Sequence, residues 1–142
     1  MEGFSFQTEV TVRFAETDAQ GVAHNAAYLV WFEVARIDYL AKYAHGYKHI
    51  QERGYEALTT ETHVRYLKPV FFDDRIVVHA RCGNVRGARF GYEYALTRGD
   101  ELVADGWTRH AVVDRQTMRP TRFPEWLAQA IERAEPGESA EP

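Results

Sequence analysis

The sequence has only one cysteine, Cys82, in 142 residues. One cysteine cannot form an internal disulfide, and it supplies at most one sulfur ligand to a zinc site, so a secreted disulfide scaffold is excluded. The sequence also lacks an excess of basic residues. The 17 Lys and Arg face 21 Asp and Glu, and this net charge of −4 argues against nucleic acid as the main partner.

Nor does the sequence show an obvious targeting or membrane-spanning segment. The first residues have neither a basic start nor a long apolar run, so they do not resemble a signal peptide, and we expect a cytoplasmic protein. The most apolar stretch, residues 26–44, includes Glu33, Arg36, Asp38 and Lys42, which are too many charges for an isolated bilayer span. This stretch therefore belongs in a protein core.

The composition is typical of a globular protein, with 45% hydrophobic and 13% aromatic residues. A chain of this size buries roughly 70% of the surface that its extended form exposes, so it can build a core without disulfides or metal. We expect a single domain over residues 1–134. Residues 135–142 are acidic and rich in turn-forming residues, and we predict that they form a disordered tail.

The N-terminal third combines a strand pattern with a helix pattern. Residues 4–14 alternate between apolar and polar side chains, which predicts a half-buried strand. After a polar loop, Asn25 is the expected N-cap of a helix in the stretch 26–44. Apolar side chains occupy most of the circumference of this helix, so it must be enclosed by a curved sheet or a neighbouring subunit. Its charged residues have the spacing of two stabilising pairs, Glu33 with Arg36 and Asp38 with Lys42.

The rest of the chain is mostly β-like. Its order predicts an α+β fold with an antiparallel sheet of about five strands, and exposed sheet edges favour oligomerisation. In the last strand, Gly106 and Trp107 interrupt the alternation and indicate a bulge. The expected elements are a short helix between Gly46 and Gly54, strands near residues 58–66, 76–82, 90–96 and 102–113, and a short helix that opens at Pro124.

One loop could carry chemistry, because Asp18 lies seven residues before Asn25. Free backbone N–H groups at a helix start can hold a developing oxyanion, and a nearby carboxylate can attack the same carbonyl or activate water. Gly21 would let the loop fold back so that both parts converge. The alternative is structural: Asp18 completes a turn and Gly21 supplies a positive φ angle.

A family resemblance favours the chemical interpretation. The segment from Arg13 to Arg36, RFAETDAQGVAHNAAYLVWFEVAR, resembles the start of 4-hydroxybenzoyl-CoA thioesterase-like hotdog proteins, which include the short-chain acyl-CoA thioesterases associated with the Tol-Pal system. Residues 64–74 and 112–120 look like later segments of the same family, so the resemblance covers nearly the whole chain. It implies a hotdog fold, in which a curved antiparallel sheet wraps a long helix, and a homodimer or homotetramer with sites between subunits.

The resemblance also implies a hydrolase for acyl-CoA thioesters that uses no cofactor. In that family the residue matching Asp18 is the nucleophile or general base, and the residue matching Asn25 donates a backbone N–H to the thioester oxygen. The expected catalytic set is therefore Asp18, Gly21, His24 and Asn25. Several relatives have Tyr-His or Asn-Asn in place of His24-Asn25, and a backbone donor tolerates that change. No Gly-x-Ser-x-Gly elbow occurs, which excludes an α/β-hydrolase.

Coenzyme A has phosphates that must be held although the chain is acidic. The local excess of basic residues over positions 65–89 is the candidate surface, and a solvated strand face is the alternative. In this family, phosphate contacts can come from the partner chain. Abundant aromatic residues, Tyr28 among them, indicate a pocket for a short or aromatic acyl group. The candidate substrate-binding residues are Tyr28, Arg65, Lys68, Arg86 and Arg89.

Metal chemistry is not expected. His45 and His49 have the i,i+4 spacing of a metal-binding pair, but no Glu-bearing zinc motif accompanies them, which favours an exposed pair.

Two other functions stay open at this point. Hydration or dehydration of an acyl thioester would need a His and a carboxylate that face the α and β carbons, and Glu33, Glu61 and His63 could supply them. A non-catalytic acyl-CoA sensor or scaffold subunit could retain the same fold. Turnover of crotonyl-CoA would indicate the first, and saturable binding without turnover would indicate the second.

Overall fold

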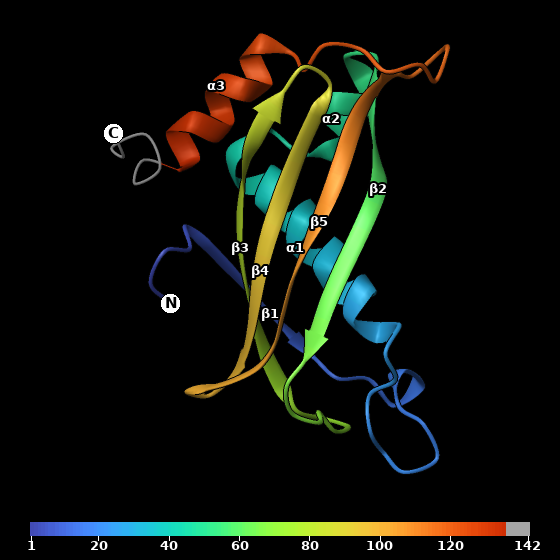
Figure 1. The fold of residues 1–142 in the computed structure, drawn as a ribbon, viewed down its shortest axis with the longest axis vertical. Helices are drawn as coiled ribbons and strands as arrows, with labels where there is room; N and C mark the ends of the chain where they lie inside the picture. Colours follow the sequence, from blue (N-terminus) through green and yellow to red (C-terminus); the bar gives the residue numbers. More distant parts are fainter. Residues whose placement is uncertain (136–142) are drawn as a thin grey trace.

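Alternating apolar and polar residues give five strands, which form one antiparallel sheet in the computed structural model (Figure 1). The structure describes residues 1–135, and the sheet order is β1-β3-β4-β5-β2, so that β1 and β2 are the edges. The elements are β1 (Phe6–Thr11), the 3-10 turn η1 (Phe14–Glu16), α1 (Ala27–Tyr43), α2 (Tyr47–Glu52), β2 (Tyr55–Tyr66), β3 (Arg75–Arg86), β4 (Arg89–Arg98), β5 (Glu101–Asp114) and α3 (Glu125–Ala134).

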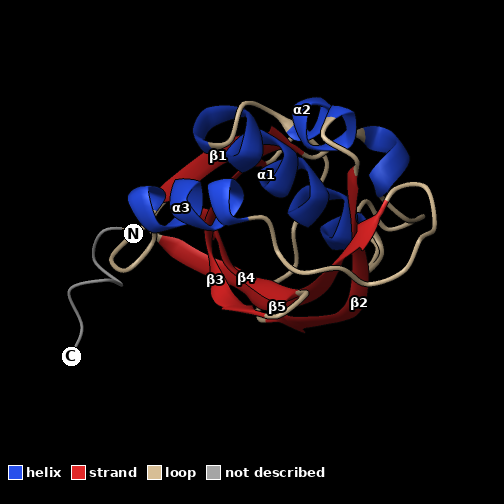
Figure 2. Ribbon diagram, turned by 90° about the horizontal axis from the view of Figure 1, so that it is seen from above, coloured by secondary structure: helices blue, strands red, loops and turns tan. Residues whose placement is uncertain are grey.

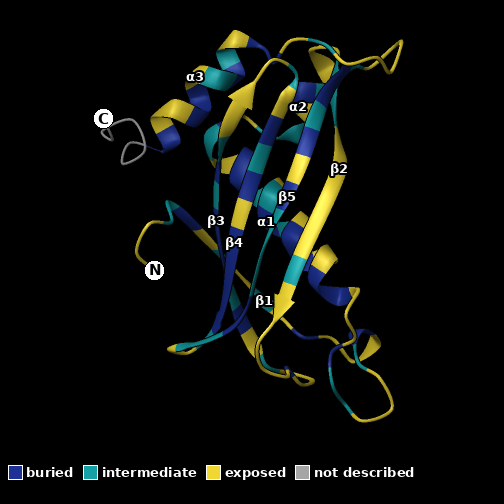
Figure 3. Cartoon of the chain, in the orientation of Figure 1, coloured by how far each residue is buried: buried dark blue, intermediate teal, exposed yellow. Residues whose placement is uncertain are grey.

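The sheet curves around α1, and the three helices lie on the same face of it (Figure 2). This arrangement confirms the expected α+β fold, in which a curved antiparallel sheet wraps a long helix. The enclosure covers only part of the helix, however. Leu29, Val30 and Ile37 remain 44%, 43% and 43% exposed, so an apolar strip of α1 is left uncovered by this chain. Buried and exposed segments alternate along the helix accordingly (Figure 3).

Aromatic stacking joins α1 to the centre of the sheet. The ring of Phe32 stacks on the ring of Tyr94 in β4, with centroids 4.0 Å apart and planes within 5°. Gly106 in β5 permits this approach, because a Cβ atom there would lie 2.9 Å from Cζ of Phe32. The predicted bulge at Gly106 is wrong: the pairing runs on unbroken through Gly106, and the register of β2 against β5 shifts instead between Thr59 and Glu61.

The start of α1 also differs from its prediction. The N-cap is Ala26 rather than Asn25, and it already has helical backbone angles, φ −68° and ψ −22°. A turn precedes the helix because the Ala27 N–H donates to the carbonyl of His24 at 3.0 Å. Asn25 lies inside that turn. It therefore cannot adopt the extended backbone of a capping residue, although its side chain is of the right type.

Neither predicted charge pair on α1 is present among the ion pairs of the described residues. Asp38 instead accepts a hydrogen bond from Oγ1 of Thr8 in β1 at 2.8 Å. Arg36 donates to the hydroxyl of Tyr94 at 3.2 Å. Both side chains are directed to the sheet, so tertiary contacts replace the local pairs.

The domain extends one residue further than expected. Glu135, assigned from the sequence to a disordered tail, is 7% exposed. Its carboxylate accepts hydrogen bonds from the hydroxyls of Tyr39 and Ser5 at 2.5 and 2.7 Å and from the Cys82 N–H at 3.1 Å. Residues 136–142, the rest of the predicted tail, lie outside the described residues. Within the described part of the chain, no helix has the length and apolar character needed to cross a membrane.

Replacement of Gly106 by Ala should lower the free energy of unfolding by about 1–3 kcal/mol, because the added methyl group meets Phe32 and the carbonyl of His63. Chemical denaturation measures the change. Gly83→Ala is the matched control, since a Cβ there meets no atom within 4 Å, and we expect a change within about 0.5 kcal/mol. Equal stability of the two variants would contradict the close packing of α1 on β5.

Candidate active site

The loop between β1 and α1 folds back on itself as a short hairpin. Thr17 pairs with Ala23, and the Asp18 N–H donates to the carbonyl of Val22 at 2.9 Å. Gly21 closes the hairpin with φ +79°, a conformation that glycine adopts without strain, and its N–H donates to the carbonyl of Asp18. The expected return of the loop is therefore present.

The carboxylate of Asp18 supports this hairpin with one oxygen. Oδ1 accepts the N–H groups of Gln20 and Val22 at 2.9 and 3.2 Å, as the structural interpretation requires. Oδ2 has no hydrogen bond within residues 1–135, and the side chain is exposed. One oxygen thus fixes the orientation of the carboxylate, while the other is free to act on a ligand.

The hairpin places Asp18 beside the start of α1. The His24 N–H donates to the carbonyl of Glu16 at 2.9 Å, so His24 lies opposite Glu16 and only two strand positions from Asp18, roughly 7 Å. The N–H groups of Asn25 and Tyr28 have no acceptor among the described residues. Because the helix dipole adds a partial positive charge there, these groups can hold an oxyanion.

Glu16 anchors the loop to the helix. This residue is 5% exposed, and its carboxylate accepts hydrogen bonds from the Arg13 N–H, the Arg13 guanidinium and the Trp31 indole at 2.9, 3.0 and 3.0 Å. Burial disfavours the ionised form, but the hydrogen bonds from Arg13 and Trp31 outweigh it, and the pKa of Glu16 falls below its ordinary value. Sequence reasoning missed this residue, although an acid two positions before Asp18 in a polar loop was a usable signal.

Aromatic side chains surround the helix start. Tyr28 is 2% exposed and packs between Trp31 and Tyr66, with ring centroids 4.7 and 4.8 Å away. The Tyr66 hydroxyl donates to the carbonyl of Asn25 at 3.1 Å, which joins the end of β2 to the start of α1. Tyr28 is thus placed at the site, as a packed wall of it.

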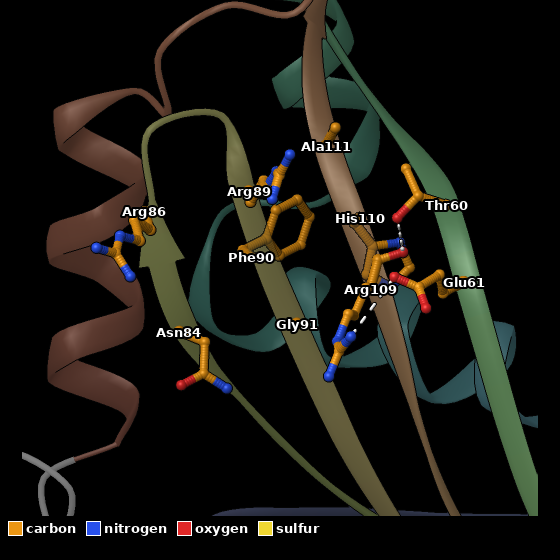
Figure 4. A pocket seen from close by; sticks show the side chains of 10 residues that line it. All are labelled: Thr60, Glu61, Asn84, Arg86, Arg89, Phe90, Gly91, Arg109, His110 and Ala111. Carbon is orange, nitrogen blue, oxygen red and sulfur yellow. Dashed lines mark hydrogen bonds and ion pairs between the residues drawn. The ribbon is translucent and has the colours of Figure 1, made fainter.

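The basic residues proposed for phosphate binding divide into two groups. Arg65 and Lys68 are held in ion pairs with Asp105 and Glu101 at 2.6 and 2.8 Å. Arg86 and Arg89 form no ion pair within the described chain, and they line a hollow together with Arg109, which the sequence argument did not single out (Figure 4). The hollow has a volume of about 430 Å³.

This hollow lies at the β3–β4 hairpin, at the opposite end of the sheet from the Asp18 loop (Figure 1). The loop contacts the segment before β3, where Val22 pairs with Phe71. The 12 residues of β3 then separate the two places by roughly 36 Å. One chain therefore does not bring Asp18 together with Arg86 and Arg89.

The residues of the alternative functions do not converge either. Glu61 pairs with Arg109 at 3.5 Å and His63 stacks on Trp107 at 5.4 Å, whereas Glu33 lines a cavity beside α1. The neighbouring Thr108 and His110 are buried on the helix side, so Glu61 and His63 face away from it. The rings of His45 and His49 lie 5.3 Å apart, and no group of three potential metal ligands occurs in residues 1–135.

The curved sheet, the enclosed helix and the carboxylate beside an open helix start define a hotdog protein of the thioesterase class. The chain belongs to the thioesterase-like superfamily, whose family model matches residues 12–131. This match confirms the family resemblance, and with it the fold, that the sequence implied.

Individual relatives agree with this family membership. The chain is 32% identical to the acyl-CoA thioesterase YbgC of Haemophilus influenzae, over 91% of this chain and 94% of that protein. It is 33% identical to a 1,4-dihydroxy-2-naphthoyl-CoA hydrolase of Thermosynechococcus vestitus, over 87% of this chain and 89% of that protein. A Thermus thermophilus thioesterase crystallised with coenzyme A and Zn superposes with a TM-score of 0.83 at 27% identity, covering 96% and 98% of the two chains. The relatives are thus hydrolases of thioesters.

Glu16→Gln should lower the free energy of unfolding by about 1–3 kcal/mol at pH 7, because a buried amide cannot accept all three hydrogen bonds. The folded-state pKa of Glu16 is lowered, so its stabilisation is complete above the ordinary pKa of 4.5 and is lost as the pH falls below it. The difference between wild type and variant should therefore shrink from pH 7 to pH 3 in urea denaturation. Glu101→Gln, which breaks surface ion pairs, should change stability by less than about 1 kcal/mol.

Proposed function

We propose that this protein hydrolyses acyl-CoA thioesters at the site formed by Asp18 and the start of α1. The observation that carries the proposal is a carboxylate whose Oδ2 is free, on a hairpin that leads directly into a helix start where the N–H groups of Asn25 and Tyr28 have no acceptor in the described chain. The names of the relatives, which are acyl-CoA thioesterases and a naphthoyl-CoA hydrolase, support the substrate class.

The chemistry follows from this geometry. The N–H groups at the helix start donate hydrogen bonds that stabilise the negative charge developing on the thioester oxygen. Oδ2 of Asp18 attacks the carbonyl carbon or removes a proton from the attacking water. The carbon–sulfur bond then breaks and coenzyme A leaves as a thiolate, which needs little protonation. If Asp18 attacks, the acyl group remains on it as an anhydride, which water then cleaves to release the acid and restore the carboxylate. A thioester carbonyl has weak resonance stabilisation, so one carboxylate suffices and no Ser-His-Asp set is required. The His24 side chain has no role in this scheme.

Asp18→Asn should lower kcat by about 10²- to 10⁴-fold, because the amide neither attacks nor accepts a proton. Thiol release from acetyl-, hexanoyl-, octanoyl-, benzoyl- and phenylacetyl-CoA measures the loss and ranks the acyl groups. Asp100→Asn, at the exposed β4–β5 hairpin, is the control and should retain wild-type activity. Full activity of Asp18→Asn would refute the catalytic role of Asp18. Binding of every acyl-CoA by the wild-type protein without turnover would indicate a sensor. Hydration of crotonyl-CoA by the wild-type protein would indicate a hydratase.

The hollow formed by Arg86, Arg89 and Arg109 is our proposed site for the phosphates of coenzyme A. Arg86 and Arg89, which form no ion pair in the described chain, suit a polyanion, since each guanidinium can donate to two phosphate oxygens. Arg109 lies beside them and pairs with Glu61, which also lines the hollow. The separation of roughly 36 Å exceeds the reach of one coenzyme A molecule. The phosphates in this hollow would therefore belong to a substrate whose thioester lies at the Asp18 loop of a second subunit.

Arg86→Gln together with Arg89→Gln should raise KM for acyl-CoA about tenfold or more while kcat changes little, because phosphate contacts are equally strong in the ground state and the transition state. The same variant should hydrolyse the acyl-pantetheine thioester, which has no such phosphates, with wild-type kinetics. Arg122→Gln, an exposed arginine outside the hollow, is the control. An unchanged KM for acyl-CoA would exclude the hollow from substrate binding.

A homodimer across the free edge of β2 accounts for the shared site. This edge is 12 residues long and pairs with no other strand within residues 1–135, and α1 presents the exposed apolar side chains of Leu29, Val30 and Ile37. A two-fold axis at this edge would pair the two β2 strands antiparallel and cover these apolar side chains. A tetramer would join two such dimers.

Ile37→Glu should convert the dimer into a monomer, because it places a charge in the apolar strip that the partner would cover. Light scattering coupled to size exclusion measures the mass, and thiol release should fall with it. Glu52→Gln, an exposed change on α2, should leave both unchanged. A wild-type protein that is monomeric and active would overturn the shared site.

A further inference from the structure

A second cavity, of about 170 Å³, lies between the C-terminal half of α1 and the inner face of the sheet. Glu33 and Arg36 of α1, Thr59 of β2 and His110 of β5 contribute to its lining. It has room for about six non-hydrogen atoms, since a water molecule takes up roughly 30 Å³. The mechanism described above does not use it.

A chain of hydrogen bonds runs behind this cavity and begins and ends in its lining. The Arg36 guanidinium donates to the Tyr94 hydroxyl at 3.2 Å, and this hydroxyl lies 2.7 Å from Oγ1 of Thr108. Oγ1 of Thr108 lies 2.7 Å from Nε2 of His110, whose Nδ1 lies 3.2 Å from Oγ1 of Thr59. Four elements, α1, β4, β5 and β2, contribute to the chain.

Arg36 can only donate, so the Tyr94 hydroxyl accepts from it. Oγ1 of Thr108 is the one acceptor within residues 1–135 for the buried Tyr94 hydroxyl proton, so Tyr94 donates to Thr108 and Thr108 donates in turn to Nε2 of His110. Burial, with a smaller effect of Arg36, lowers the pKa of His110 to about 3, so the imidazole is neutral and donates from Nδ1 to Thr59. The hydroxyl proton of Thr59 remains available at the cavity, at the end of a chain in which every bond polarises the next.

The cavity lining thus offers hydrogen-bond donors to a ligand. Arg36 forms no ion pair within residues 1–135, and its single hydrogen bond there goes to Tyr94, which leaves guanidinium N–H groups unused. Glu33 also lines the cavity and is exposed, so its charge opposes that of Arg36 and disfavours an anionic ligand. A neutral oxygen that only accepts, as in a carbonyl group, matches this lining best.

The orientation of α1 determines which subunit's substrate could reach the cavity. Its start lies at Tyr66, where β2 ends, and Tyr47, just beyond its end, donates to Glu56 near the start of β2, so the helix runs antiparallel to β2. In the dimer proposed above, the two-fold axis brings the start of the partner's α1, with the partner's Asp18, to the end of β2 that borders this cavity.

We propose that this cavity receives the acyl group of a thioester held at the partner's Asp18, and that Arg36 and Thr59 select acyl groups with a carbonyl oxygen near their far end. The proposal rests on the thioesterase function and the dimer of the preceding section. It names a substrate class, oxo-acyl thioesters, and two residues that determine specificity.

Three acyl-CoAs of equal chain length test the selection: hexanoyl-CoA, 5-oxohexanoyl-CoA and adipoyl-CoA. We expect kcat/KM for 5-oxohexanoyl-CoA to exceed that for hexanoyl-CoA about 10- to 100-fold, the effect of a hydrogen bond to a charged donor. Adipoyl-CoA should be the poorer of the two oxygenated substrates, and Glu33→Gln should improve it. Values for 5-oxohexanoyl-CoA and hexanoyl-CoA within twofold of each other in wild type would overturn the proposal.

Two variants assign the selection to residues. Arg36→Met and Thr59→Val should each lower the ratio of kcat/KM for 5-oxohexanoyl-CoA over hexanoyl-CoA at least threefold, whereas Arg53→Met, whose guanidinium lies on Trp126 away from the cavity, should retain it. Thr59 lies on the exposed edge strand, so Thr59→Val decides the question if Arg36→Met does not fold. A wild-type ratio in the folded variants would contradict the assignment.

Failure of the proposed function would be visible separately, as absence of turnover with every acyl-CoA. In that case, calorimetry can still compare the affinities of Asp18→Asn for 5-oxohexanoyl-CoA and hexanoyl-CoA. Equal affinities would overturn the proposed selection of oxo-acyl groups by the cavity. A mixed dimer tests whether the cavity of one chain serves the Asp18 of the other. When one chain has Asp18→Asn and the other Arg36→Met, a shared site unites the intact Asp18 with the intact Arg36. The ratio of kcat/KM for 5-oxohexanoyl-CoA over hexanoyl-CoA then stays at the wild-type value. A site within one chain would give the ratio of Arg36→Met.

Discussion

The structure depends on the burial of one aromatic face of α1 against the concave side of the sheet. The stack of Phe32 on Tyr94 is the closest contact of this kind, and Gly106 makes it possible because it has no side chain. Once this face is fixed, the position of the helix start is fixed as well. The free N–H groups of α1 then lie at a defined corner of the sheet, next to the segment that precedes β3.

The same packing is the basis of the proposed shared site. The sheet covers one side of α1 and leaves the strip with Leu29, Val30 and Ile37, the edge of β2 and the side chain of Asp18 exposed. Electrostatic stabilisation of an oxyanion is stronger where water is excluded. A partner that covers the strip would therefore supply both the missing wall of the site and the distant arginine hollow.

The loop shows that the structural interpretation of Asp18 leaves room for the proposed chemical one. Asp18 supports a turn and also has an oxygen to spare, because the two carboxylate oxygens take different roles. The loop could be located from Asp18 and Gly21, since polar residues and a glycine mark a return of the chain. Its attachment to α1 through Glu16 could not, because the Trp31 indole that holds Glu16 lies fifteen positions away.

The sequence by itself determined the order and type of the elements, the family and the loop that holds the candidate nucleophile, because periodicity, turn residues and a long motif are local properties. It misplaced the helix cap, the charge pairs of α1 and Glu135, since backbone geometry and competing partners decide these. Only the tertiary structure decided that Arg86 and Arg89 join Arg109 at the far end of the sheet from Asp18, and that Arg36 opens onto a cavity. Those relations depend on strand register and helix orientation, which bring together residues that no spacing along the chain connects.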